Sequence, residues 1–463
     1  MIHIDDLPRA CDASSLAADP FAHLRRAAEA PGPVVLLREG GAIFSRRPDC
    51  PLTVAAFGPE ALRQALSNDL SYAMPPSAAD LLGLPERLRR LNHGLHSMSG
   101  GRHRRQKLLI GGALAATERD FPQPAVNAAV DRTVAGRADA PLPMLAAMRT
   151  LLESVAATIL FGPQEAQNGN LARTLGDYFR RRRAASSPLG KSGATDRDDL
   201  ARSGAELDEA LSRAVRASRS DPNGRGLVGT LATARDGDEI AFTDDELVAH
   251  ANVLFMSATE PVAVALTWLF LLLSQAPWWF ARLRSAGPEA AAARLAPVVA
   301  ETLRLLTPNA IMVRSARPGA VLCGVPLPDH SEVVAAPLVA HRNPDVFPCP
   351  DRFDPRRWRS ARPGPFEYLP FGAGLHVCVG QGLAKRLIRS VALRIVEQFD
   401  LVLASAEPID WHIDIMLKPS SDILFVASPS SSSPLLSMQE WVGPSRDLVD
   451  LELLKIDLNY PIM

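Results

Sequence analysis

A glycine-rich segment that contains Cys378 is the part of the sequence best suited to carry chemistry. The segment reads Phe371–Gly–Ala–Gly–Leu–His–Val–Cys–Val–Gly380 and precedes a stretch with helical periodicity. A thiolate that binds iron needs a loop that exposes the sulfur to the metal while backbone N–H groups point at that sulfur. Gly372 and Gly374 permit such a turn, and Gly380 lets the following helix approach a flat macrocycle closely. Because the dipole of that helix adds positive charge near the thiolate, Cys378 is the predicted iron ligand.

Two observations bear on the prediction that Cys378 is the iron ligand. They are how often its sequence pattern arises by chance and how the other cysteines are spaced. A buried structural cysteine in a strand-to-helix turn is the alternative, but Phe-x-x-Gly-x-x-x-Cys-x-Gly should arise by chance in only about one in a thousand chains of this composition. The other cysteines are far apart and form no CxxC pair; they are Cys11, Cys50, Cys323 and Cys349. This spacing argues against a disulfide framework or a zinc site and favours a reducing compartment.

The composition is that of an ordinary globular protein with a large core. The chain has 463 residues, of which 47% are hydrophobic, and a formal net charge of -1. A nucleic-acid binder would usually show a marked basic excess. The N-terminus lacks the pattern of a secretory signal, and the longest apolar run, 261–273, is too short for a membrane span. We therefore expect a cytoplasmic protein that binds neither nucleic acid nor a membrane.

Hydrophobic periodicity indicates a mainly α protein with a small β region. Apolar residues recur at three- and four-residue spacing through most of 59–310, and again after Gly380. Frequent prolines break residues 305–365 into short strands and turns, and further strand-like runs end at residues 423–426.

The C-terminal end of the chain differs from the rest. A serine- and proline-rich linker, 428–434, separates the main domain, 1–427, from an extension, 435–463. The extension is too apolar for a free tail, since it contains Trp441, Leu451, Leu453, Leu454, Ile456 and Leu458. We expect it to pack against the main domain or a partner, either a carrier protein or a second copy of the chain. A disordered, dispensable extension is the alternative.

Two further motifs precede the cysteine segment. Glu301–Thr–Leu–Arg304 is a Glu-x-x-Arg motif that begins 77 residues before Cys378, and Phe353–Asp–Pro–Arg–Arg–Trp358 lies between the two. A lone Glu-x-x-Arg pair decorates many helices and indicates little. In this order and spacing, however, the three motifs resemble those of the cytochrome P450 superfamily, and the resemblance extends over roughly residues 15–427.

This resemblance implies the cytochrome P450 fold, which is mainly α with a small β-rich region. It also implies haem b, iron protoporphyrin IX, as the cofactor and Cys378 as its axial ligand. The residues that would shape the loop around the haem are Phe371, Gly372, Gly374 and Gly380. The residues that would form a buried structural network are Glu301, Arg304 and Arg356.

Haem propionates are two carboxylates at the edge of a buried ring, so they need cationic or hydrogen-bonding partners. By family position these partners are His103, Lys107, Arg314 and His376. Lys107 stands where the family usually has Arg, and a Lys can still pair with a carboxylate, though without the bidentate fork. A solvated basic helix face is the alternative for the segment 102–107.

The helix that the family uses to activate oxygen departs most from the common pattern. The aligned segment retains the acid as Glu260, whereas Pro261 stands at the alcohol position. In the common mechanism the alcohol and the acid organise water that delivers protons. Pro261 has neither hydroxyl nor N–H, so it should kink the helix and free carbonyls at Met256 or Ser257 that can hold water. Thr259 is close in sequence but turned away from the direction of Pro261. Together with Glu260 and Pro261 it completes the set of candidate catalytic residues.

The leading functional interpretation is a monooxygenase that inserts one atom of dioxygen into a mainly apolar small molecule of a biosynthetic pathway. Electrons would come from a ferredoxin and a ferredoxin reductase. A basic proximal face would bind the acidic partner through Arg102, Arg104, Arg105, Lys385 and Arg386. The apolar residues expected in the substrate pocket are Met74, Leu82, Phe255, Ile311 and Met312.

Because Pro261 replaces the alcohol, a second interpretation stays open. It is a peroxide-driven peroxygenase, or a haem-thiolate isomerase, dehydratase or oxidative coupling enzyme. A third interpretation is a haem protein whose extension recruits a carrier protein, which no residue supports directly.

Overall fold

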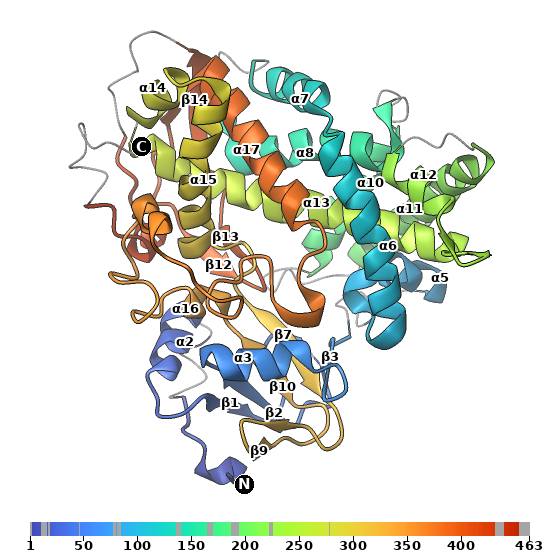
Figure 1. Ribbon diagram of the computed structural model, residues 1–463, viewed down its shortest axis with the longest axis vertical. Coiled ribbons are helices and arrows are strands. Elements are labelled where there is room, and N and C mark those ends of the chain that lie inside the picture. The colour runs from blue at the N-terminus through green and yellow to red at the C-terminus, as the bar shows by residue number, and fades with distance from the viewer. Residues whose placement is uncertain are drawn as a thin grey trace.

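The computed structural model describes residues 2–452, apart from 11–15, 17–18, 46, 77–79, 81–84, 136–139, 164–169, 187–193, 222–225, 277 and 431–438. Helices make up the upper part of the molecule in Figure 1, and a smaller region that contains the main sheet lies below them. The prediction of a mainly α protein with a small β region is therefore confirmed.

The helices vary widely in length. In chain order they are α2 (Pro20–Ala28), α3 (Gly58–Ser67), α5 (Glu86–Arg89), α6 (Gly100–Arg119), α7 (Gln123–Ala135), α8 (Met144–Phe161), α10 (Asn170–Ser186), α11 (Ala194–Ser220), α12 (Gly226–Ala232), α13 (Asp244–Ser274), α14 (Trp278–Arg284), α15 (Pro288–Leu305), α16 (Pro337–Ala340) and α17 (Gln381–Gln398). Short 3-10 helices are η1 (Ile4–Asp6), η2 (Arg90–Asn92), η3 (Leu95–Ser97), η4 (Pro355–Arg359), η5 (Gly374–His376) and η6 (Pro444–Leu448).

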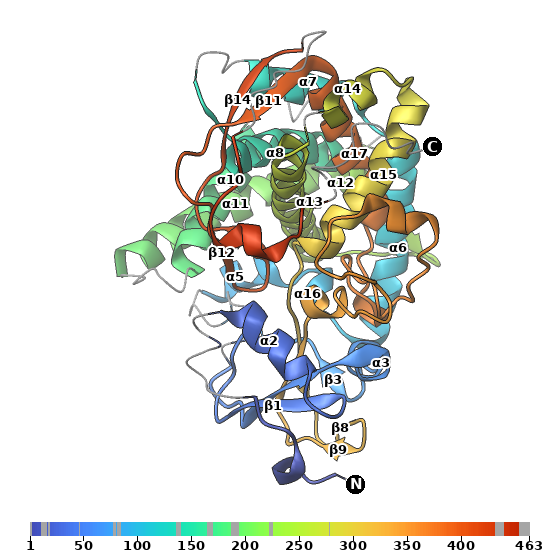
Figure 2. The same ribbon diagram turned by 90° about the vertical axis from the view of Figure 1, so that its left-hand side faces the viewer.

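The helix α13 runs through the centre of the helical region (Figure 1, Figure 2). Its start is fixed by a capping box, in which the Thr243 hydroxyl accepts from the Glu246 N–H (3.2 Å) and the Glu246 carboxylate accepts from the Thr243 N–H (2.8 Å). Beyond the first turn α13 is apolar on nearly all sides, which is typical of a helix inside a core. Both α13 and α8 are long and apolar enough to cross a membrane by composition, but most of each is packed inside the protein.

Five strands form the main sheet. They are β1 (Val34–Glu39), β2 (Leu52–Ala56), β10 (Glu332–Ala335), β7 (Met312–Ala316) and β3 (Tyr72–Ala73), in that spatial order. The strands β2 and β10 pair in parallel, and the other pairs are antiparallel. Because β7 has a partner on each side, the direction of Arg314, which pairs with Val333 of β10, is well fixed.

The remaining strands form small sheets at the periphery. One sheet joins β11 (Phe399–Leu403), β14 (Leu424–Pro429) and β4 (Leu142–Pro143), so it ties the start of α8 to the end of the main domain. The others are two-stranded: β12 (Trp411–Ile413) with β13 (Leu417–Pro419), β5 (Arg235–Asp236) with β6 (Glu239–Ile240), and β8 (Val321–Leu322) with β9 (Val325–Pro326). Since β14 extends to residue 429, the first two residues of the expected linker belong to a strand.

The described part of the C-terminal extension, 439–452, packs against the main domain. Trp441 is buried, and its backbone N–H donates to the side chain of Gln275 at the end of α13 (3.0 Å). The Asp450 carbonyl accepts from the N–H of Phe353 (2.9 Å), and its carboxylate pairs with Arg352 (3.2 Å). Apolar residues predicted to anchor the rest of the extension lie outside the described residues: Leu453, Leu454, Ile456 and Leu458.

Candidate haem-binding site

The segment around Cys378, residues 371–380, forms a tight loop that contains η5 and ends where α17 begins. Gly372 and Gly374 have φ angles of 73° and 68°, which L side chains rarely adopt. A Cβ atom on Gly374 would also lie 2.3 Å from the carbonyl oxygen of Leu66 in α3, so only glycine fits there. The backbone N–H of Cys378 donates to the carbonyl of Phe371 (2.8 Å) and closes the loop.

The side chain of Cys378 is exposed and faces a cavity. Burial is the largest influence on the thiol and raises its pKa above the ordinary value. A backbone hydrogen bond from Gly380 and the positive charges of Lys107 and Lys385 act in the opposite direction, because they stabilise the thiolate. These donors and charges are what an iron-binding thiolate requires.

The cavity has a volume of about 470 Å³ and lies between the cysteine loop, α6, α13 and β7. Its wall is mostly apolar. Of the residues predicted for the substrate pocket, Met74, Ile311 and Met312 line it. Phe255 is instead buried in the core, where it stacks on Phe179 with 5.8 Å between the ring centroids. Leu82 lies outside the described residues.

Four nitrogen-bearing side chains from three parts of the fold meet at this cavity, namely His103, Lys107, Arg314 and His376. The rings of His103 and His376 stack with their centroids 4.2 Å apart. Burial is the first cause that lowers the pKa of both histidines, to about 3 for His376, and the neighbouring cations lower both values further. Burial also lowers the pKa of Arg314 to about 10, so that guanidinium remains charged at neutral pH.

The hydrogen bonds of these cations test whether the site fits iron protoporphyrin IX. Lys107 donates to the Leu375 carbonyl (2.6 Å) and Arg314 to the Val313 carbonyl (2.8 Å). In the described part of the chain neither cation pairs with a carboxylate, which is costly for buried charges. Two propionate carboxylates would offset that cost, and the sulfur of Cys378 opens into the same cavity. The residues present therefore fit the haem group.

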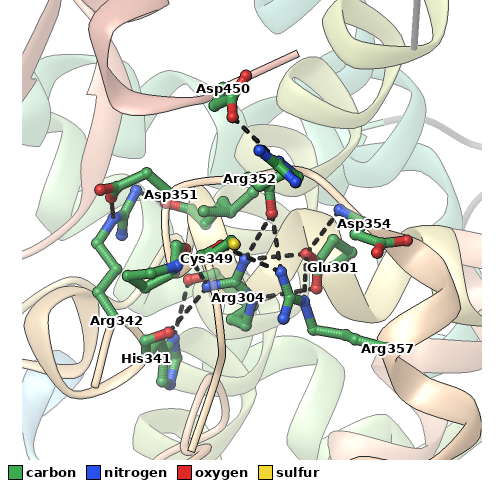
Figure 3. A network of polar contacts seen from close by, with 12 residues as sticks. Glu301, Arg304, His341, Arg342, Cys349, Asp351, Arg352, Asp354, Arg357 and Asp450 are labelled. Atoms are coloured by element: carbon green, nitrogen blue, oxygen red, sulfur yellow. Dashed lines mark hydrogen bonds and ion pairs between the residues drawn. The ribbon is translucent and has the colours of Figure 1, made fainter. Parts of the chain in front are cut away.

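Glu301 and Arg304 of α15 form a fully buried ion pair (Figure 3), with hydrogen bonds of 2.9 Å and 3.0 Å. The other guanidinium N–H groups donate to backbone carbonyls of His341 (2.9 Å), Pro350 (2.6 Å) and Arg352 (3.0 Å). The Glu301 carboxylate also accepts from the backbone N–H of Asp354 (2.9 Å), from Arg357 (2.8 Å) and from the indole of Trp358 (3.0 Å). The pair thus ties α15 to the irregular segment 341–358.

The third side chain of this network is Arg357, which corrects the prediction of Arg356. Both arginines lie in η4, where consecutive side chains point in different directions. Arg356 pairs with Asp354, two residues before it (2.7 Å), while Arg357 turns inward to Glu301. The family motif indicates that an arginine of this segment joins the network but does not decide between neighbours.

The helix α13 passes along the cavity and contributes Ser257, Ala258, Pro261, Val262 and Ala265 to its wall. Although a proline at position 261 is expected to kink α13, the helix continues through this residue without a break. Thr259 is buried, and its hydroxyl donates to the carbonyls of Phe255 (3.0 Å) and Met256 (3.2 Å). Within the described residues, neither Thr259 nor Glu260 lines the cavity.

Comparison with known proteins places this site in a family. Residues 204–425 match the family model described as "Cytochrome P450". "Cyclooctatin synthase" from Streptomyces melanosporofaciens is 35% identical over 179 residues, which cover 35% of this chain and 39% of that protein. "Putative cytochrome P450 137" from Mycobacterium tuberculosis (strain CDC 1551 / Oshkosh) is 25% identical over 282 residues, which cover 58% of this chain and 59% of that protein. The chain thus matches less than two thirds of the length of these relatives.

Solved structures extend the likeness to nearly the whole chain. The haem domain of a cytochrome P450DA mutant has a TM-score of 0.75 at 17% identity and covers 93% of this chain and 99% of its own. The structure titled "Retinoic acid bound cyanobacterial CYP120A1" has a TM-score of 0.74 at 21% identity and covers 92% and 99%. The chain belongs to the cytochrome P450 superfamily. Haem b is therefore the cofactor of this P450, and its fold is the cytochrome P450 fold.

In this P450 two arginines hold Glu260, the acid of the helix that is predicted to activate oxygen. Glu260 accepts from Arg149 of α8 (2.5 Å and 2.8 Å) and from Arg183 of α10 (2.9 Å). Burial, the largest single influence, favours the neutral acid, but the two arginines and Lys418 together hold the pKa of Glu260 below its ordinary value. Glu260 is therefore an ionised residue that joins three helices, and its role in proton delivery stays a prediction.

Several site residues of this P450 had no signal in the sequence. Arg149 and Arg183 lie 111 and 77 residues from Glu260, and Arg183 belongs to a run of arginines with the composition of a solvated helix end. His96 of η3 lines the cavity, and in the described part of the chain its buried Nδ1 has no hydrogen-bond partner. In the sequence, the one feature that points to His96 is its position shortly before the segment 102–107.

The basic face predicted from the sequence is less positive in the structure of this P450. Arg102 pairs with Glu246 (2.6 Å), Arg104 with Asp69 (3.2 Å) and Arg105 with Asp236. Lys385 instead lies over the ring of Phe371 in the cysteine loop (5.2 Å), and Arg386 lies over Phe121 (4.5 Å). Of the predicted cations, these two from α17 remain the better candidates for contact with an acidic partner.

Proposed function

We propose that this P450 is a monooxygenase that inserts one atom of dioxygen into a mainly apolar small molecule of a biosynthetic pathway. The observation that carries the proposal is the sulfur of Cys378, which opens into a mostly apolar cavity. Lys107 and Arg314 stand at the same cavity and have no carboxylate partner among the described residues, as the propionates of a haem would require.

Each group at the cavity has a part in this proposal. Cys378 would bind the haem iron, and the propionate partners would be His103, Lys107, Arg314 and His376. Haem bound through a thiolate supplies the electron density that favours O–O cleavage. The chain itself supplies the apolar walls of α13 and β7, which would hold the substrate and exclude water. The Glu301–Arg304 pair would hold the segment before the cysteine loop in place.

The lining of the cavity supports an apolar substrate of moderate size. Its polar groups are few apart from the propionate partners, and they include Ser257 and Asn309. A solved structure of the same fold has retinoic acid bound, and a curated relative is a cyclooctatin synthase. A binding screen that follows the shift of the haem absorption band would identify ligands that displace water from the iron.

Electrons would come from a ferredoxin and a ferredoxin reductase in the cytoplasm. Lys385 and Arg386 on α17 would contact the acidic carrier, close to the loop that holds Cys378. Charge reversal at both positions should slow electron transfer and weaken its dependence on salt. A carrier protein or a second copy of the chain as a partner of the extension is a separate proposal, tested by removing residues after 433.

A second function is favoured by one observation, which is Pro261 on the cavity wall where the family places an alcohol. A peroxide-driven peroxygenase, or an isomerase, dehydratase or coupling enzyme, would need no proton relay at this position. Turnover with dioxygen and a ferredoxin system supports the monooxygenase. Efficient turnover with peroxide alone, and none with dioxygen and several electron donors, would establish the second function instead.

A further inference from the structure

Ser257 stands out among the residues of α13. It is exposed to the cavity in the middle of a helix whose neighbouring residues are mostly buried. The hydroxyls of Thr259 and Thr267 donate to carbonyls of their own helix. In the described part of the chain, the Ser257 hydroxyl donates no such bond, so it is available to a group in the cavity.

The other residues on this part of α13 that could donate a hydrogen bond into the cavity either lack a donor group or are already bound to other groups. Pro261 lines the cavity but has no hydroxyl and no N–H. The Thr259 hydroxyl is bound to backbone carbonyls, and the ionised Glu260 carboxylate is held by Arg149 and Arg183.

The spacing of Ser257 and Pro261 adds a second argument. Residues four apart lie on the same face of a helix, and both of these residues line the cavity. Because Pro261 has no N–H, the carbonyl of Ser257 lacks its usual helix donor. Residue 257 therefore presents a hydroxyl and a free backbone acceptor together, which is the donor and acceptor pair that holds a water molecule.

We propose that Ser257 is the hydrogen-bond donor of α13 toward the water or small ligand bound in the cavity, and so replaces the alcohol missing at position 261. The hydroxyl donates to that ligand, and the free carbonyl of Ser257 accepts from a water. The inference rests on the proposed monooxygenase function, since a dioxygen enzyme needs such a donor, but the placement of the hydroxyl is testable apart from turnover.

The first test uses carbon monoxide bound to the reduced haem protein as a probe. A hydrogen bond to the bound gas shifts its C–O stretching frequency. Ser257→Ala and Ser257→Val should move this frequency in the same direction, whereas Ser257→Thr, which keeps the hydroxyl and matches Val in shape, should keep it near the wild-type value. Thr267→Val, which removes a hydroxyl from the same helix outside the cavity lining, is the control and should not move it. An unchanged frequency in both Ala and Val variants would overturn the proposal.

The second test measures product formed per electron with dioxygen. Loss of a single hydrogen bond predicts a roughly fivefold to tenfold fall in Ser257→Ala and Ser257→Val, with recovery in Ser257→Thr. Pro261→Thr placed on the Ser257→Ala protein should restore an alcohol and recover part of the loss. Equal coupling in all variants would overturn the role of Ser257. Efficient wild-type turnover with peroxide, and none with dioxygen and several electron donors, would refute the proposed function instead. The carbon monoxide comparison would still report on the hydroxyl.

Discussion

Removal of the Glu301 carboxylate is the perturbation for which the structure gives the clearest expected cost. The carboxylate accepts from Arg304, Arg357, Trp358 and the backbone of Asp354. Glu301 and Arg304 are both 0% exposed, so water cannot replace the lost partner. Glu301→Ala therefore leaves a buried guanidinium without its counter-ion.

The magnitude follows from the cost of breaking a buried ion pair from one side, which is ~3–5 kcal/mol. Native proteins are stable by only about 5–15 kcal/mol, so this is a large share. The unfolding entropy is about 2.1 cal/mol/K per residue, so a chain of 463 residues loses only about 1 °C of melting temperature per kcal/mol. The expected fall in melting temperature is therefore ~3–5 °C, and Glu301→Gln, which keeps the shape of the side chain, should lie between Ala and the wild type.

The assays are thermal and urea unfolding followed by circular dichroism, together with the haem content of the purified protein. Arg352→Ala is the matched control, because Arg352 lies beside the network but its salt bridge with Asp450 is partly exposed (34% for each side chain), and such pairs contribute about 1 kcal/mol or less. The carbonyl that Arg352 offers to Arg304 survives in that variant. A Glu301→Ala protein that is as stable and as rich in haem as Arg352→Ala, with only its turnover lost, would refute the structural role of the pair.

Three further predictions follow from single positions. Gly374→Ala should lower stability by more than ~1–2 kcal/mol and reduce haem content, because its φ is 68° and the new Cβ would meet the Leu66 carbonyl. The control Gly112→Ala, in open space on α6, should raise stability by ~0.5–1 kcal/mol. Equal effects of the two substitutions in urea unfolding would contradict the loop geometry. Trp441→Ala should lower the free energy of unfolding by ~3–5 kcal/mol if the extension is part of the core, while Val442→Ala, at an exposed position, should be neutral. Truncation after Ser433 with unchanged melting temperature, solubility and oligomeric state would refute the ordered extension. Glu260 has a folded-state pKa below 4.5, so its contribution to stability is present above pH 4.5 and is lost as the pH falls through the lowered value. Glu260→Gln should lack this contribution and show a shallower loss of stability in acid than the wild type. Parallel curves of stability against pH for the two proteins would show that Arg149 and Arg183 do not stabilise the anion.

Much of the fold and of the cysteine loop could be predicted because local sequence determines them. Gly372 and Gly374 adopt the left-handed conformation that the turn requires, and the apolar periodicity of α13 and α8 specifies buried helices. The Glu-x-x-Arg spacing likewise places Glu301 and Arg304 on one face of a helix.

The parts of the site that could not be predicted depend on contacts between distant segments. Arg149 and Arg183 reach Glu260 from α8 and α10, and no local pattern links the three residues. The difference between Arg356 and Arg357 depends on how η4 packs against α15, which a motif cannot specify.

The central claim is that Cys378 is the thiolate ligand of a haem, and the absorption spectrum of the reduced protein under carbon monoxide tests it most directly. We predict that the wild-type protein shows the red-shifted band that gives the family its name and that Cys378→Ala loses it. A Cys378→Ala protein that keeps this band unchanged, or a haem-loaded wild-type protein that never shows it, would contradict the account.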